Sequence, residues 1–281
     1  MPTLVDEVEQ VANEADRQPG EERKAVILAG GRGTRLAPYT SVLPKPLMPI
    51  GDRSILEIVI DQLASSGFTD IVLCVGYLSH IIQAVLEGRP TQAAIAYRKE
   101  THALGTAGPL RLVEGLDEPF LAMNGDVLTT LDYEDMFEHH LDSENALTIG
   151  VHERTMDIDY GVPLTTFDDH DSNALRVIQY TEKPSLRITV SMGVYVVEPR
   201  VLGYIPEGRH YDVPDLIQAL LDANEQVGAY LFQGFWLDIG RHEDYEVAVE
   251  MWEDQVKALE GHTDGPRSEV GVSSAAASRD A

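Results

Sequence analysis

The sequence predicts an α/β protein with a doubly wound, mainly parallel sheet. Short apolar runs alternate with helical patterns through the first half of the 281-residue chain. This alternation is typical of parallel strands joined by crossover helices. The first apolar run, Ala25 to Ala29, ends abruptly in the glycine-rich segment 30–33. Because ligands of such sheets bind beyond the carboxyl ends of the strands, we expect the functional site at this segment.

The glycine-rich segment has the composition of a polyphosphate cradle. Its three glycines allow positive φ angles and let a ligand approach the backbone N–H groups closely. Fixed positive charge lies nearby on Arg32, Arg35 and Lys45. The segment is not a Walker A loop, which ends in Gly-Lys-Ser/Thr, and Leu36 stands where a dinucleotide fingerprint has its third glycine.

The later elements follow from periodicity and end signals. Ser54 is a candidate N-cap for a helix that runs to Leu63 and stops at Gly67. Further strands are expected at 71–75, 94–97 and 120–124, with helices at 79–86 and 133–141. Thr106 is a candidate cap for the helix that follows it.

From about residue 145 onward strand-like runs dominate. They lie at 146–151, 162–167, 175–180, 189–197 and 227–232, with helices expected at 214–223 and 245–259. We expect this β-rich half to pack against the first without a flexible linker.

Composition excludes several classes of protein. The formal net charge of −26 argues against nucleic acid or an anionic membrane as partner. No apolar run approaches the length of a membrane span, and the acidic extension 1–22 lacks the hydrophobic core of a signal peptide. The single cysteine, Cys74, lies in an apolar run and is expected in the core. We therefore expect a cytoplasmic protein, with a disordered tail at 262–281.

Two aspartates, Asp126 and Asp238, lie next to or within apolar runs, where a charged side chain is unusual. Asp126 follows the apolar run 120–124, which places it at the rim of the sheet, and Asp238 interrupts the apolar run 235–239. Carboxylate oxygens combined with phosphates suit Mg²⁺, and a buried unpaired carboxylate is unfavourable. The alternative for each aspartate is a backbone cap. Adjacent His139 and His140 point in different directions on a helix, so a metal site there is not expected.

Two segments in order resemble the sugar-1-phosphate nucleotidylyltransferases. The family's opening signature Leu-Ala-Gly-Gly-x-Gly-Thr-Arg-Leu matches Leu28 to Leu36, and its Pro-Lys-Pro matches residues 44–46. The resemblance covers about residues 24–250. It implies a Rossmann-like nucleotidyltransferase fold over 23–261, with a nucleotide half at about 23–144 and a sugar-phosphate half at about 145–261.

The resemblance also implies roles for individual residues. Arg35, Lys45, Asp126 and Lys183 would be catalytic, and Asp126 with Asp238 would hold Mg²⁺. The nucleotide would be bound by Leu28, Ala29, Gly30, Gly31, Gly33, Thr34, Gly105 and Thr106. The sugar phosphate would be bound by Gly161, Glu182, Lys183 and Ser191, where Ser191 replaces an asparagine that is usual in the family.

The resemblance implies that the protein acts on a nucleoside triphosphate and a sugar 1-phosphate. It leaves open whether the chain forms a homo-oligomer. The wording Leu-Gly-Thr-Ala-Gly-Pro at 104–109 is closest to the mannose-1-phosphate guanylyltransferases. Thymidylyl, uridylyl or cytidylyl transfer to glucose 1-phosphate or another hexose or heptose 1-phosphate is the alternative. An inactive regulatory homologue would be expected to lose the metal carboxylates, the arginine or the lysines. All of these residues are present. The sequence contains no hexapeptide repeat, so we do not expect the β-helix extension that some relatives carry.

Overall fold

The computed structural model of the chain describes residues 23–168 and 171–260. The expectations for the acidic extension 1–22 and for the tail 262–281 lie outside these residues. Among the described helices, none is both long and apolar enough to cross a membrane.

A mainly parallel sheet forms the centre of the body. The described residues form a seven-stranded sheet in the order β12-β8-β11-β6-β1-β4-β5. In it β11 is antiparallel to both neighbours, while the other paired strands run parallel. This topology confirms the predicted fold class. The strands of this sheet are β1 (Arg23–Ala29), β4 (Phe68–Val75), β5 (Ala94–Lys99), β6 (Phe120–Asn124), β8 (Leu147–Asp157), β11 (Ser185–Val197) and β12 (Val227–Phe232).

Helices cover both faces of the sheet. One face packs against α2, α3, α4 and α6, and the other packs against α5 and short 3-10 turns. The helices are α2 (Ile55–Ser65), α3 (Ser79–Leu86), α4 (Tyr133–Leu141), α5 (Val213–Asp222) and α6 (His242–Glu260). A short hairpin pairs β2 (Pro49–Ile50) with β3 (Arg53–Ser54), and a second two-stranded antiparallel sheet pairs β7 (Val127–Thr129) with β13 (Trp236–Asp238), which is distant in the sequence.

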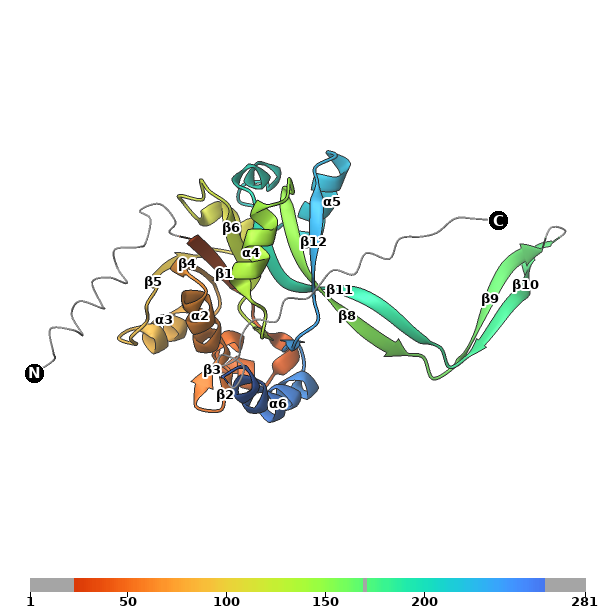
Figure 1. Cartoon of the computed structure of the whole chain (residues 1–281), viewed down its shortest axis with the longest axis horizontal. Coiled ribbons are helices and arrows are strands. Elements are labelled where there is room, and N and C mark those ends of the chain that lie inside the picture. Colours follow the sequence, from red (N-terminus) through yellow and green to blue (C-terminus); the bar gives the residue numbers. More distant parts are fainter. Residues whose placement is uncertain (1–22, 169–170, 261–281) are drawn as a thin grey trace, which may run out of the picture.

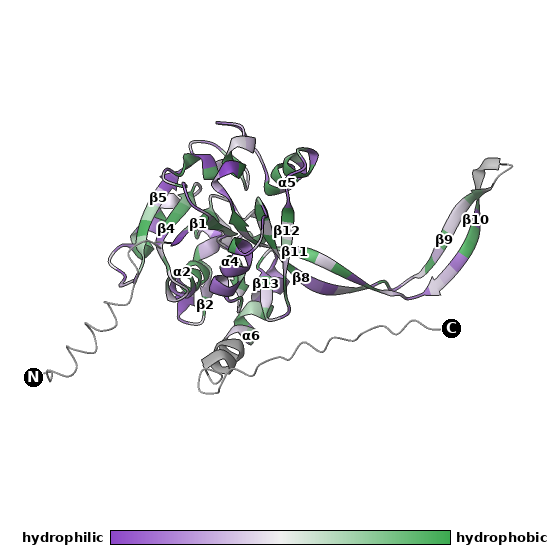
Figure 2. Cartoon of the chain, turned by 45° about the horizontal axis from the view of Figure 1, so that its top comes forward, coloured by the Kyte–Doolittle hydropathy of each residue, from purple (hydrophilic) through white to green (hydrophobic). Residues whose placement is uncertain are grey.

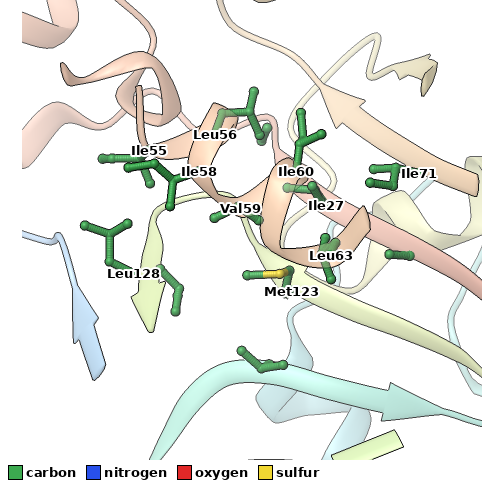
Figure 3. Close-up of a cluster of buried hydrophobic side chains, with 14 of the residues drawn as sticks. Ile27, Ile55, Leu56, Ile58, Val59, Ile60, Leu63, Ile71, Met123 and Leu128 are labelled. Carbon is green, nitrogen blue, oxygen red and sulfur yellow. The ribbon is translucent and has the colours of Figure 1, made fainter. Parts of the chain in front are cut away.

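Helix α2 illustrates how the core is specified. Ser54 caps it as expected, and a reciprocal hydrogen bond between the Glu57 carboxylate and the Ser54 backbone completes a capping box. Part of its apolar surface faces the sheet, where Val59 and Leu63 lie near Ile27 and Met123 (Figure 3). Figure 2 shows the same apolar character along the strands beneath the helices.

The β-rich half differs from its prediction. The first residues of β8 and the last of β11 belong to the body sheet, but both strands then continue outward as a two-stranded ribbon. At the tip of the ribbon the chain enters a separate hairpin of β9 (Gly161–Asp168) and β10 (Asp171–Glu182). We call residues 152–168 and 171–191 the arm. Figure 1 shows the arm extending away from the body, so the expected packing of this segment on the first half is absent among the described residues.

Candidate active site

The glycine-rich loop connects β1 to a short 3-10 turn at Thr34–Leu36. Gly33 has φ +59°, and a Cβ there would lie 3.0 Å from side-chain atoms of both Lys45 and Thr40. The Thr40 hydroxyl donates to the Gly33 carbonyl at 2.8 Å. A residue other than glycine would therefore be strained in conformation and crowded, which fixes the loop as an open backbone cradle.

A cavity of about 440 Å³ opens at this loop, beyond the carboxyl ends of β1 and β6. This is the edge of the sheet at which ligands of the fold are expected. The cavity is lined by most of the residues singled out from the sequence, namely Leu28, Ala29, Gly30, Gly31, Gly33, Thr34, Arg35, Lys45, Gly105, Thr106, Asp126 and Asp238. The structure thus brings the nucleotide and metal candidates together in one hollow.

Lys45 lies between two carboxylates on the floor of this cavity. Its ammonium group forms a close ion pair with Asp126, and the Asp238 carboxylate is 3.9 Å away. Lys45 is 8% exposed, so the positive charge is partly withdrawn from water. One oxygen of Asp126 is buried and has no hydrogen-bond partner in the part of the chain that the structure describes.

Strand pairing explains why the two aspartates meet. The chain turns after β6 through Gly125, whose N–H donates to the Leu28 carbonyl at 3.0 Å, and Asp126 follows. Strand β13 then pairs with β7, so that Asp238 lies opposite Val127. Residues far apart in the sequence are thereby held side by side next to the glycine-rich loop.

The environment of Asp238 opposes its ionisation. Partial desolvation of Asp238, whose side chain remains 47% exposed, raises its pKa above its usual value, and the neighbouring negative charge of Asp126 adds to this, while Lys45 and Arg35 act in the opposite direction. A carboxyl whose pKa is raised by folding disfavours the folded state once the unfolded chain ionises. A cation bound beside Asp238 would favour the ionised carboxylate and relieve this cost.

Asp238→Asn should stabilise the protein at pH 7 in the presence of a chelator. The unfolded carboxyl ionises near pH 4, so the destabilisation grows as the pH rises from there through the higher folded pKa. The substitution removes this destabilisation, because an asparagine side chain does not ionise. Calorimetric melting at pH 4 and pH 7 should show a gain for the variant that is larger at pH 7. An unchanged or lower melting temperature at pH 7 would contradict this electrostatic account.

Another part of the cavity lining is held in place by contacts between two segments that are distant in the sequence. Gly105 has φ +81°, and a Cβ there would lie 2.6 Å from the Tyr211 carbonyl oxygen. The Thr106 N–H donates to the Asp212 carboxylate at 2.9 Å, and the Val213 N–H donates to the Thr106 hydroxyl at 2.9 Å. The prediction that Thr106 caps the following helix is therefore wrong, because its hydroxyl instead binds the first turn of α5.

Glu100 is a cavity residue that the sequence reasoning missed. It follows β5, and its carboxylate accepts the Leu104 N–H at 3.1 Å. A Cβ added to Gly30 would lie 1.9 Å from a Glu100 oxygen, so the carboxylate lies against the first glycine of the glycine-rich loop. Burial raises the pKa of Glu100. His210 and Asn124 also line the cavity without having been singled out. The available signal in the sequence was an acidic residue two positions before the segment 102–109.

The sugar-phosphate candidates lie elsewhere. Gly161, Glu182 and Lys183 lie where the ribbon meets the hairpin, and Ser191 lies at the base of the arm. None of these four residues lines the cavity. The Tyr180 hydroxyl donates to Glu182 at 3.1 Å, and both side chains lie over Gly161. Lys183 is exposed and has φ +45°.

Cys74 and His140 are structural. Cys74 is fully buried, and burial raises the pKa of its thiol to about 12. His140 is buried too, with its Nδ1 2.8 Å from the Thr148 hydroxyl, and burial lowers its pKa. Neither residue faces the cavity. Among the described residues, no cluster of three or more His, Cys, Asp or Glu side chains is placed to hold a metal.

A parallel sheet that presents a glycine loop, a buried lysine and paired carboxylates at one edge is the arrangement of a nucleotide-binding α/β protein. Sequence comparison is more specific. The family model described as nucleotidyl transferase matches residues 24–255, and the chain belongs to this family. Its resemblance to the sugar-1-phosphate nucleotidylyltransferases is thereby confirmed.

The relatives include enzymes named for different bases and sugars. A mannose-1-phosphate guanyltransferase from Aspergillus oryzae is 34% identical over 79% of this chain. A UTP–glucose-1-phosphate uridylyltransferase from Synechocystis is 32% identical over 80% of it. The chain spans 62% of the length of each of these two relatives. The crystal structure of HddC from Yersinia pseudotuberculosis complexed with GMP-PN has a TM-score of 0.61 at 26% identity, over 82% of this chain and 99% of that one.

Proposed function

We propose that the protein transfers a nucleotidyl group from a nucleoside triphosphate to a sugar 1-phosphate, giving an NDP-sugar and pyrophosphate. The observation that carries this proposal is the cavity in which the glycine loop, Arg35, Lys45 and two aspartates converge. A phosphate oxygen of the sugar 1-phosphate attacks the α-phosphorus of the triphosphate in line. The bond from the α-phosphorus to the bridging oxygen breaks, and pyrophosphate leaves.

The chemistry requires positioning and charge neutralisation rather than a nucleophilic side chain. Both substrates are polyanions and repel each other. Backbone N–H groups of the glycine loop and the guanidinium of Arg35 would bind the triphosphate. Lys45 would stabilise the charge that develops at the α-phosphate, where its low exposure strengthens the interaction.

Asp126 and Asp238 would hold a divalent cation, with Mg²⁺ the proposed ion. The fit rests on the buried, unpartnered oxygen of Asp126 and on the raised pKa of Asp238. Two carboxylates leave room for the waters and phosphate oxygens that Mg²⁺ retains as ligands. The ion would neutralise phosphate charge and orient the two substrates.

GTP and mannose 1-phosphate are the proposed pair. The segment 104–109 and the Aspergillus relative support this pair, and Glu100 supports the base. Guanine presents two neighbouring donors, N1–H and the 2-amino group, which a carboxylate can accept together. Uracil and thymine offer a single such donor. Glu100 lines the cavity and accepts the Leu104 N–H at the start of this segment, and we assign it to the nucleobase on that ground. The alternative remains another base and another hexose or heptose 1-phosphate.

Glu100→Gln should lower kcat/KM for GTP by roughly ten- to a hundredfold, because a hydrogen bond to a charged group is worth about 1.5–3 kcal/mol. The glutamine oxygen can still accept the Leu104 N–H, which preserves the loop. Turnover with UTP should change much less. Glu114→Gln, at an exposed position outside the cavity, is the matched control. An equal loss with GTP and UTP would remove Glu100 from base selection.

A pyrophosphate-release assay over a panel of nucleoside triphosphates and sugar 1-phosphates tests the function directly. Turnover with GTP and mannose 1-phosphate is the expected result. Turnover restricted to dTTP, UTP or CTP would overturn the guanylyl assignment and keep the reaction class. Nucleotide-sugar binding without turnover would favour the inactive regulatory homologue.

A further inference from the structure

The arm consists of strands on which no other described part of the chain packs as a layer. Its hairpin lies at the far end of the ribbon, away from the helices and the sheet of the body (Figure 1). An isolated two-stranded hairpin is marginally stable in water at best. Its side chains are nevertheless apolar and aromatic at many positions, as the green stretches along β10 indicate (Figure 2).

One face of the hairpin is suited to burial. Strand pairing places Phe167 opposite Leu175 and Thr165 opposite Val177. Phe167 is 69% exposed, and Leu175 and Val177 are more than half exposed. Contiguous exposed apolar surface of this kind marks an interaction site.

The cavity of the body is short of positive charge for its proposed substrates. Among the described residues that line it, Arg35 and Lys45 are the fixed cations, and Lys45 already pairs with Asp126. A triphosphate and a sugar phosphate together require more positive charge than these two side chains supply. Lys183, by contrast, is exposed, and its ammonium group has no hydrogen-bond or ion-pair partner in the part of the chain that the structure describes.

The base of the arm is fixed to the body. The Trp236 indole N–H donates to the Met192 carbonyl at 3.0 Å, and the Arg154 guanidinium lies 4.8 Å from the centre of the Trp236 ring. Nδ1 of His152 is 2.9 Å from the Phe232 carbonyl oxygen. A bulge at 191–195, with Gly193 at φ +75°, sets the direction in which the ribbon leaves.

Lys183 lies beyond this fixed base. The ribbon is paired without a break from Ser191 opposite Val151 to Ser185 opposite Asp157. At about 3.3 Å per residue its length is roughly 20 Å. Bending at the tip moves the hairpin but leaves Lys183 at the tip. The arm therefore cannot bring Lys183 to the cavity of its own chain unless the base contacts break.

We propose that two copies of this chain exchange arms, so that Lys183 and Glu182 of each copy complete the cavity of the other. This exchange rests on the proposed function, because we assign Lys183 to the sugar phosphate that the proposed reaction uses. Exposed Tyr39 and Val42 lie in the segment between Gly33 and Lys45, the two ends of which line the cavity. They form the apolar surface that receives the hairpin. A cavity completed in this way contains a third fixed cation and is covered from water.

Complementation tests the exchange. Asp126→Asn has a defective cavity with an intact arm, and Lys183→Ala has an intact cavity with a defective arm. The two variants, co-expressed with different tags and purified through both tags, form a mixed dimer with one complete site. Its activity should be about half that of wild type per dimer, although each variant alone is nearly inactive with sugar 1-phosphate below its KM. If each arm serves its own chain, the mixed dimer has no complete site and stays inactive.

The oligomeric state is measured independently of activity. Light scattering should give a dimer for wild type and a monomer for Phe167→Asp/Leu175→Asp, whereas Leu221→Asp, at an exposed position on α5, should remain a dimer. Circular dichroism verifies that each variant is folded. A monomeric wild type overturns the exchange even if the enzyme is active. A dimer that lacks all turnover overturns the proposed function and leaves the exchange standing if the hairpin variant is monomeric.

Discussion

Asp126→Asn is expected to lower kcat by about a thousandfold or more while the protein stays folded. A divalent cation at a phosphoryl site supplies several kcal/mol of charge stabilisation, and about 1.4 kcal/mol corresponds to tenfold. Asp238→Asn should have an effect of similar size. Because both carboxylates are proposed to hold the same ion, the double variant should be little worse than either single one. Single-turnover kinetics over a range of Mg²⁺ concentrations measures the loss of activity in the two single variants and in the double variant.

Asp70→Asn is the matched control. Asp70 pairs with Lys24 at 3.0 Å near the start of β1, and it does not line the cavity. The Asp70→Asn variant should lose little activity, since a partly exposed ion pair contributes about 1 kcal/mol or less to stability. Losses at Asp126 and Asp238 that multiply in the double variant would mean that the two residues act separately. Retained activity in either single variant would remove that residue from the metal site.

The body of the protein could be predicted from the sequence because its signals are local. Ser54 with Glu57 defines the start of α2, and apolar periodicity defines the buried side of the helix. The position of Asp126 after β6 follows from strand polarity alone. That Asp238 would meet it depends on the pairing of β13 with β7, which no local pattern encodes.

The arm could not be predicted, because strand signals do not specify what covers a strand. Alternation along β9 and β10 indicates one apolar face, and the simplest expectation is that the body buries it. The structure has no body element there among its described residues. Thr106 shows the same limit, since its actual partners, Asp212 and Val213, come from α5 and the residue before it. Such contacts are set by tertiary packing and override a local capping signal.

Lys45→Ala and Lys183→Ala should impair the enzyme in different ways. Lys45 lies against Asp126 in the cavity and is proposed to meet charge that develops at the α-phosphate, so its loss should lower kcat more than it weakens either substrate. Lys183 is proposed to grip the sugar phosphate, so its loss should raise KM for the sugar 1-phosphate and leave nucleotide binding nearly intact. A charged contact of this kind is worth about 1.5–3 kcal/mol, hence roughly ten- to a hundredfold for each lysine.

Salt distinguishes these specific contacts from a general electrostatic effect. In a chain with a net charge of −26, any lysine near the cavity offsets negative charge at long range. Such an effect is screened beyond about 8 Å at physiological ionic strength, so it would give both variants similar, modest losses that fade in high salt. Lys24→Ala, whose ammonium group is bound to Asp70 and the Gly115 carbonyl outside the cavity, controls for loss of charge alone. Steady-state kinetics at low and high salt should give distinct, salt-resistant defects for Lys45 and Lys183, because the two are assigned to different phosphates; matching, salt-sensitive defects would contradict both assignments.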